Sequence, residues 1–240
     1  MKTNLKVVSP DDNSTWSEEL TDFIESKSAK YDFETNVFGN DDDDRLRSLI
    51  APNHVLVYHA TKLLPHEITL IESDGLMPLT PELMELKINH AVLSDFLTDW
   101  QGEELLNGSS FRTRADEQRS NQICLILGCN VLYENHSGFT KLLNIWGGES
   151  INHTDAGEKH ERHLMEIGIP AIIKLGIPVG PDVDLGQDYP LRKPFYGNFL
   201  KRPESITIRW EGSLIPSEWI LDILKPGDFE FDAFNLPIGK

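Results

Sequence analysis

Cysteine is scarce in this chain of 240 residues. Only Cys124 and Cys129 occur, five positions apart, within or just after an apolar segment. A disulfide framework needs several cysteines, and a thiolate zinc site needs cysteine pairs at ligand spacing, so the pattern supports neither. We expect both thiols to be reduced and buried.

Long apolar runs are also missing. No stretch of about eighteen apolar residues occurs, which is the length that a membrane-spanning helix needs. The start of the sequence, Met1 to Lys6, lacks the apolar core of a secretion signal. The sequence therefore predicts no membrane segment and, by default, a cytoplasmic location.

Basic residues are outnumbered, since 22 Lys and Arg stand against 39 Asp and Glu, for a formal net charge of -17. A surface of this sign repels a phosphate backbone and attracts cationic partners, so strong generic nucleic-acid binding is not expected. The 39% of hydrophobic residues suffices for one sizeable core. We expect that core in residues 51–240. Residues 1–50 are expected to form an acidic N-terminal appendage, which could cover a functional site, bind a partner or pack on the core.

The rest of the chain is interpreted around residues 54–61, with the sequence His-Val-Leu-Val-Tyr-His-Ala-Thr. Val55 to Val57 predict a short buried strand, and His59 and Thr61 follow it as hydrogen-bonding side chains at its end. Pro65 suits the first turn of a helix, and Gly75 suits the left-handed residue that follows a helix, before Leu76 and Pro78.

This order of strand, His-x-Thr, short helix and Gly-Leu-x-Pro resembles the ADP-ribosyltransferase fold. The similarity is to its His-first branch, which includes the poly-ADP-ribose polymerases and the DNA-targeting ADP-ribosylating toxins. In that branch the His-x-Thr grips the ribose and the nicotinamide amide of NAD. The resemblance implies an α+β fold with a split mixed β-sheet and flanking helices, with NAD as substrate. It makes His59 catalytic and Thr61 an NAD contact, with Tyr58 stacking on a ring and Gly75 beside the site.

Two further segments carry candidate ligand contacts. Arg112 and Arg114 precede a second predicted strand, Ile123 to Leu127, and a planar guanidinium can donate two parallel hydrogen bonds to a pyrophosphate. Pairing with surface carboxylates is the alternative for these arginines.

The second segment is Trp146-Gly147-Gly148-Glu149, where adjacent glycines allow close approach of a ligand and the indole offers a flat wall for a nicotinamide or adenine ring. A Gly-Gly helix stop without chemistry is the alternative for these residues.

Two other patterns favour structural roles. Thr80 and Pro81 open an amphipathic helix, which we expect to continue to Gly102 or Gly108. His160 and His163 could share a helical face, but the His-Glu-x-x-His spacing of zinc proteases is absent, so no metal is expected.

The catalytic acid has several candidates. Ile206 to Trp210 alternates as a strand and is followed by Glu211, and then by a segment from Leu214 to Ile223. This ending resembles the close of an ADP-ribosyltransferase core, where a strand carrying the catalytic acid leads into an Ile-Pro-x-x-x-Ile segment and a last strand. We rank Glu149 and Glu211 together as catalytic acids, with Glu204 behind them.

The resemblance implies an NAD-dependent ADP-ribosyltransferase that modifies a macromolecular acceptor, protein or nucleic acid. Free-standing enzymes of this kind are most often toxins or effectors, and an inhibitory partner protein would then restrain them. Two alternatives remain, a non-enzymatic acidic module that binds a basic partner and an NAD-linked RNA 2'-phosphotransferase, which would need a basic groove.

Overall fold

The protein is described here from a computed structural model. The description covers residues 5–28, 40–109, 120–133, 137–179, 191–202, 205–211, 213–234 and 236. The side chains of residues 40, 41, 137–139, 149 and 152 lie outside this description.

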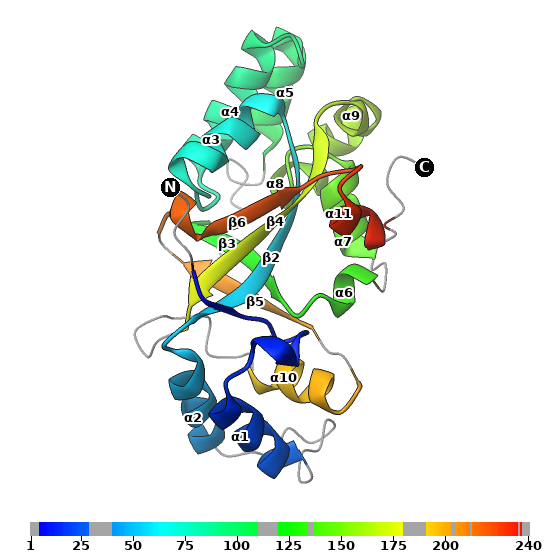
Figure 1. Ribbon diagram of the computed structural model, residues 1–240. Helices are drawn as coiled ribbons and strands as arrows, with labels where there is room; N and C mark the ends of the chain where they lie inside the picture. Colours follow the sequence, from blue (N-terminus) through cyan, green and yellow to red (C-terminus); the bar gives the residue numbers. More distant parts are fainter. Residues whose placement is uncertain are drawn as a thin grey trace.

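A single sheet forms the centre of the described chain (Figure 1). Its strands are β1 (Val7–Val8), β2 (His54–Leu63), β3 (Gln122–Leu127), β4 (Ile169–Pro178), β5 (Ile206–Glu211) and β6 (Ile220–Leu224). The order across the sheet is β5-β3-β2-β4-β6, and β1 pairs with the start of β2. That short pairing is parallel, whereas the other pairings are antiparallel. The architecture is therefore mixed α+β with a mixed sheet.

Helices surround the sheet on both faces and at both ends (Figure 1). The α-helices are α1 (Glu18–Ser28), α2 (Asn40–Ile50), α3 (Pro65–Asp74), α4 (Pro81–Leu93), α5 (Asp99–Gly108), α6 (Asn130–Tyr133), α7 (Ser137–Asn144), α8 (Glu149–Asn152), α9 (Asp155–Glu166), α10 (Arg192–Phe199) and α11 (Phe229–Ala233). Two short 3-10 helices are η1 (Asn13–Thr15) and η2 (Ser217–Trp219). Among the helices described, none combines the length and apolar character needed to cross a membrane.

Strand β2 is longer than the sequence predicts. The expected strand ended near Val57, but β2 pairs with β4 along its whole length, from His54 opposite Pro178 to Leu63 opposite Ile169. His59 and Thr61 therefore lie inside a strand and not at its tip. Because side chains alternate along a strand, both project from the same face of β2.

On its other side, β2 pairs with neighbouring strands over only a few residues. It pairs with β3 only at Val57 and Tyr58, which lie opposite Leu127 and Ile126. Strand β3 in turn pairs with β5 along its whole length, from Gln122 opposite Glu211 to Leu127 opposite Ile206. The sheet is thus continuous at one end and opens between β2 and β3 beyond Tyr58.

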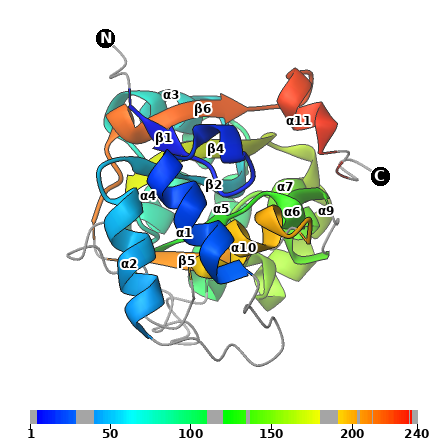
Figure 2. The same cartoon turned by 60° about the horizontal axis from the view of Figure 1, so that its bottom comes forward.

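The N-terminal helices belong to the main core. Leu20 and Ile24 of α1 and Leu46 of α2 are buried in the same hydrophobic cluster as Val57 of β2. Figure 2 views the molecule from this end and shows α1, α2 and α10 side by side, in agreement with the contacts among them. Of the roles left open for residues 1–50, packing is the one that the described helices α1 and α2 adopt.

The helix expected from Thr80 onward is broken in two. Helix α4 ends at Leu93, and Asp95 adopts a left-handed backbone with φ of 59°. The Thr98 hydroxyl then accepts a hydrogen bond from the Gln101 N–H and begins α5. A positive φ at a non-glycine residue is incompatible with a continuous right-handed helix, so the amphipathic pattern spans two helices.

Candidate functional site

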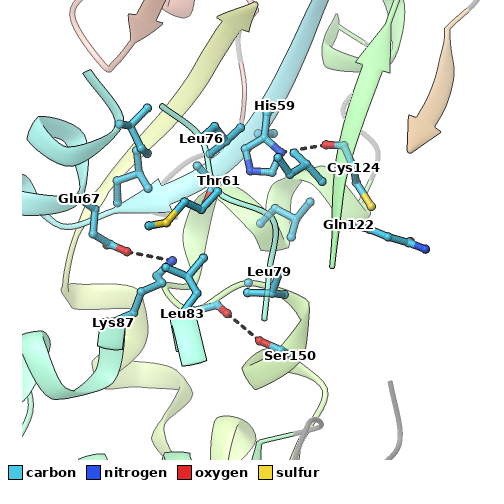
Figure 3. Close-up of a pocket in the computed structure, with 18 of the residues that line it drawn as sticks. His59, Thr61, Glu67, Leu76, Leu79, Leu83, Lys87, Gln122, Cys124 and Ser150 are labelled. Atoms are coloured by element: carbon cyan, nitrogen blue, oxygen red, sulfur yellow. Dashed lines mark hydrogen bonds and ion pairs between the residues drawn. The ribbon is translucent and has the colours of Figure 1, made fainter. Parts of the chain in front are cut away.

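A cavity of about 460 Å³ opens where β2 and β3 separate. Helices α3 and α4 form one wall, β3 and β5 form another, and Gly147 and Gly148 contribute a third. Its volume lies within the range typical of small-molecule sites. Figure 3 shows the side chains that converge on it, including His59 and Thr61.

His59 spans the gap between the two strands. Its Nδ1 lies 2.8 Å from the carbonyl oxygen of Cys124 on β3 (Figure 3). A carbonyl can only accept, so Nδ1 carries the hydrogen and Nε2 is left as an acceptor in the neutral ring. Burial lowers the pKa of His59 below its ordinary value, which opposes protonation at neutral pH. The site therefore presents a neutral imidazole with a free acceptor, two residues from the hydroxyl of Thr61.

A buried carboxylate stands on the α3 side of the cavity. Glu67 Oε2 accepts hydrogen bonds from the Leu64 backbone N–H at 2.6 Å and from the Trp146 indole N–H at 2.8 Å. Its Oε1 lies 2.9 Å from the ammonium of Lys87 on α4 (Figure 3). Burial alone would raise the pKa of Glu67, but Lys87 and the two N–H donors hold it below the ordinary value. This carboxylate is ionised and fully engaged, which suits a structural support better than a reacting acid.

Cationic side chains outnumber carboxylates among the described residues that line the cavity. Arg209 on β5 lines it together with Lys87, whereas Glu67 is the carboxylate. His66 and His90 stand at the α3–α4 side, with ring centroids 5.1 Å apart in a stacked arrangement. An anionic ligand is thus favoured inside the cavity although the chain as a whole is strongly acidic.

The Gly-Leu segment after α3 is tied to the segment after β5. Leu76 and Ile215 exchange two backbone hydrogen bonds of 2.9 Å. Gly75 lies next to this bridge with φ of 107°, and a Cβ atom there would lie 2.2 Å from the Ile215 carbonyl oxygen. Gly75 also lines the cavity. The absence of a side chain at Gly75 allows the backbone after α3 to pack closely against the backbone after β5, although the two segments are far apart in the sequence.

The structure separates the candidate acids. Glu211 ends β5 on the same exposed face as Arg209, and the side-chain amide of Gln122 donates a 2.9 Å hydrogen bond to Glu211 Oε1. Gln122 lines the cavity, so Glu211 lies at its edge. Glu149 begins α8 directly after Gly148, but its side chain is outside the described residues, and so is Glu204 altogether.

Three predictions made for the site need correction. Tyr58 projects from the opposite face of β2 and packs edge-on against Phe234, with centroids 6.4 Å apart. Trp146 is fully buried and bonded to Glu67, so it has no surface on which a ring could stack. Cys124 is exposed and lines the cavity, contrary to the expectation that both thiols are buried.

Of the remaining predicted site residues, the structure describes the two glycines but not the two arginines. Gly147 and Gly148 line the cavity with positive φ angles of 103° and 66°. A Cβ on Gly148 would meet nothing within 4 Å, so this backbone is open to an incoming group. Arg112 and Arg114 lie outside the described residues, and the role of a guanidinium at the cavity is instead available to Arg209.

The histidines considered for a metal have other partners. His160 Nε2 lies 2.7 Å from Glu104 Oε2, and His163 Nε2 lies 2.7 Å from the Phe96 carbonyl oxygen. Within the described ranges, no group of three or more His, Cys, Asp and Glu side chains is placed to hold a metal ion.

Sequence reasoning missed most of the cavity wall. Glu67, Lys87 and Arg209 drew no attention because each looks like an ordinary charged residue of an amphipathic element. Arg209 had a usable signal, because the alternation of β5 places it on the polar face beside a predicted acid. The pairing of Glu67 with Lys87 across two helices had none.

Comparison of the chain with protein-family models, with curated proteins and with solved structures finds no match.

Proposed function

We propose that the protein is an NAD-dependent ADP-ribosyltransferase with a fold of the ADP-ribosyltransferase type. The observation that carries the proposal is the placement of His59 and Thr61. They project together from β2 into a cavity that opens where the sheet splits. The motif that resembles the family's NAD grip is thus in a position to hold a ligand.

The proposed chemistry breaks the bond between nicotinamide and ribose. The electron pair of that bond leaves with the nicotinamide, and positive charge develops on the ribose as an oxocarbenium-like centre. A lone pair of the acceptor then bonds to the same carbon, and the acceptor's proton passes to a nearby carboxylate and on to water. His59 Nε2, as an acceptor, would bind a ribose hydroxyl, and Thr61 would orient the nicotinamide end.

Glu211 is the proposed acid. It ends the late strand β5, which matches where the resemblance places the family's acid. It is also joined through Gln122 to the cavity. The carboxylate of Glu67 is less suited because Lys87 and Trp146 already engage both of its oxygens. Glu149 remains the second candidate, because Gly148 before it and Ser150 after it line the cavity.

The pyrophosphate of NAD has cationic partners in the cavity. Arg209 lies opposite Cys124 in the β3–β5 pairing, and Cys124 is the residue whose carbonyl contacts His59. The guanidinium of Arg209 therefore lies in the same region of the cavity as the imidazole of His59. A guanidinium can donate two parallel hydrogen bonds to phosphate oxygens. Lys87 supplies a second cation, already oriented by Glu67.

The acceptor is proposed to be a macromolecule, and the enzyme to act as a toxin or effector restrained by a partner. An NAD-linked RNA 2'-phosphotransferase is less well supported because it needs a basic groove for RNA. The exposed acidic residues of α3 and α4 beside the cavity, Glu72, Asp74, Glu82 and Glu85, oppose that. A non-enzymatic acidic module that binds a basic partner is also less well supported, because the cationic side chains of Lys87 and Arg209 in the cavity favour an anionic ligand.

The test is nicotinamide release from NAD by the purified chain, with Glu211→Gln and Glu149→Gln compared side by side. Glutamine at position 211 can still accept from Gln122, so the fold should survive. We expect Glu211→Gln to lose at least about 1,000-fold in rate and Glu149→Gln much less. A loss confined to Glu149→Gln would move the acid to α8. No release by the wild type, and no rise in melting temperature with millimolar NAD, would reject the proposed function.

A further inference from the structure

We propose that the rim of the cavity docks a segment of a partner protein in which an apolar side chain is flanked by Lys or Arg. This inference rests on the proposed function in one respect only, that the docked segment would be the acceptor of ADP-ribose. It names the acceptor class that the resemblance leaves open, a basic peptide segment and not a polynucleotide.

Apolar side chains form the α3–α4 side of the rim. Leu70 on α3, Met77 in the following connection and Leu86 on α4 all line the cavity, and they are 37%, 40% and 45% exposed. Large apolar side chains that are exposed together around one opening favour contact with an apolar group from outside. A polar nucleic-acid backbone would gain nothing from covering them.

Acidic side chains flank the same rim. Asp74 lies four residues after Leu70 and next to Gly75, and Glu82 lies four residues before Leu86, so each shares a helical face with a rim residue. Both are exposed. Their charge attracts Lys and Arg and repels phosphates, in line with the net charge of -17.

On the α3–α4 side of the cavity the charges are sorted by depth. Lys87 is mostly buried, with 18% of its side chain exposed, and its ammonium is turned toward Glu67 inside the cavity. Asp74 and Glu82 stand outside on the helix surfaces. An anionic dinucleotide inside and a cationic peptide outside would each meet the opposite charge. A polynucleotide at the rim would meet like charge.

The test is binding of two fluorescein-labelled probes, followed by polarisation at physiological salt. One is a short peptide with a Leu-Leu pair flanked by Lys and Arg, and the other is a single-stranded oligonucleotide of similar length. The charge variant is Asp74→Lys with Glu82→Lys, and its matched control is Asp99→Lys with Glu103→Lys on α5, outside the cavity. The apolar variant is Leu86→Ser, and its control is Leu93→Ser on the same helix, where the leucine is 79% exposed and does not line the cavity.

We expect the charge variant to weaken peptide binding at least tenfold, Leu86→Ser to weaken it at least fivefold, and each control to stay within twofold. Equal binding by the charge variant and its control would overturn the inference, as would tighter binding of the oligonucleotide than of the peptide. Nicotinamide release is measured on the same proteins. Peptide binding with these sensitivities but without nicotinamide release would reject the proposed chemistry and keep the docking surface. Release without peptide binding would do the reverse.

Discussion

The imidazole of His59 and the backbone carbonyl of Cys124 are 2.8 Å apart across the opening between β2 and β3. The two strands stop pairing at Tyr58, so a side chain takes over a contact that backbone hydrogen bonds make elsewhere in the sheet. One nitrogen of the ring is thereby assigned to the fold and the other to the cavity. A structural role and a ligand role are combined in one residue and can be separated by substitution.

His59→Asn separates them. The Asn side-chain N–H can still donate toward the Cys124 carbonyl, but no acceptor remains at the position of Nε2. We expect a melting temperature within a few degrees of wild type and at least about 100-fold slower nicotinamide release. His153→Asn, at an exposed position outside the cavity, serves as control. Wild-type turnover in His59→Asn would remove the anchor role from this ring.

Stability is expected to fall in mild acid. Burial is the largest cause of the lowered pKa of His54, His59 and His66. As the pH falls through about 6.5, the unfolded chain binds protons at these residues before the folded chain does, so the three histidines lower the free energy of unfolding in that range and leave it unchanged well above it. Urea unfolding at a series of pH values checks this, and His59→Asn should flatten the slope. A free energy of unfolding that rises between pH 6.5 and 5 would contradict it.

The Glu67–Lys87 pair should couple strongly. Glu67→Gln keeps the acceptor for Leu64 and Trp146 but leaves the ammonium of Lys87 without its counter-charge, which we expect to cost about 1–3 kcal/mol. Lys87→Met should cost a similar amount, and the double variant less than the sum of the two. The exposed pair of Arg162 and Glu166 is the control, since such pairs contribute about 0–1 kcal/mol. Denaturant unfolding gives the four free energies, and simple additivity at Glu67 and Lys87 would refute the coupling.

Gly75→Ala should destabilise the protein by about 2–4 kcal/mol, because the added Cβ would lie 2.2 Å from the Ile215 carbonyl oxygen and φ is 107°. Gly227→Ala is the matched control, since its φ of 96° imposes similar backbone strain while its Cβ would meet nothing within 4 Å. The difference in melting temperature between the two variants isolates the steric contact. Equal losses would show that strain alone accounts for the effect.

Much of the secondary structure follows from local pattern. The strand at Ile206 to Trp210 alternates clearly, and β5 extends it by one residue to Glu211. Strand β3 begins at Gln122, one residue before the predicted Ile123. These strands are predictable because burial of one face requires alternating apolar and polar residues, and burial of both faces requires a short apolar run.

The site was harder to predict because its contacts join distant segments. Trp146 looks like a ligand wall in sequence, but its indole N–H has a buried partner in Glu67, 79 residues earlier. No local sequence pattern around Trp146 or Glu67 predicts that the two side chains are in contact. The packing of α1 and α2 in the core could not be predicted for the same reason, since the sequence of an amphipathic helix shows that it packs but not against which element.

Strand β2 has β4 along one side and, along the other, β1 at His54 and Val55 and β3 at Val57 and Tyr58. The amides of β2 that donate to β4 should thus be among the slowest in the molecule to exchange with deuterium. The two groups proposed to grip NAD would then be pre-organised before any ligand arrives. Little ordering entropy would be lost at that end of the dinucleotide, and adaptation on binding would fall to the helices across the cavity.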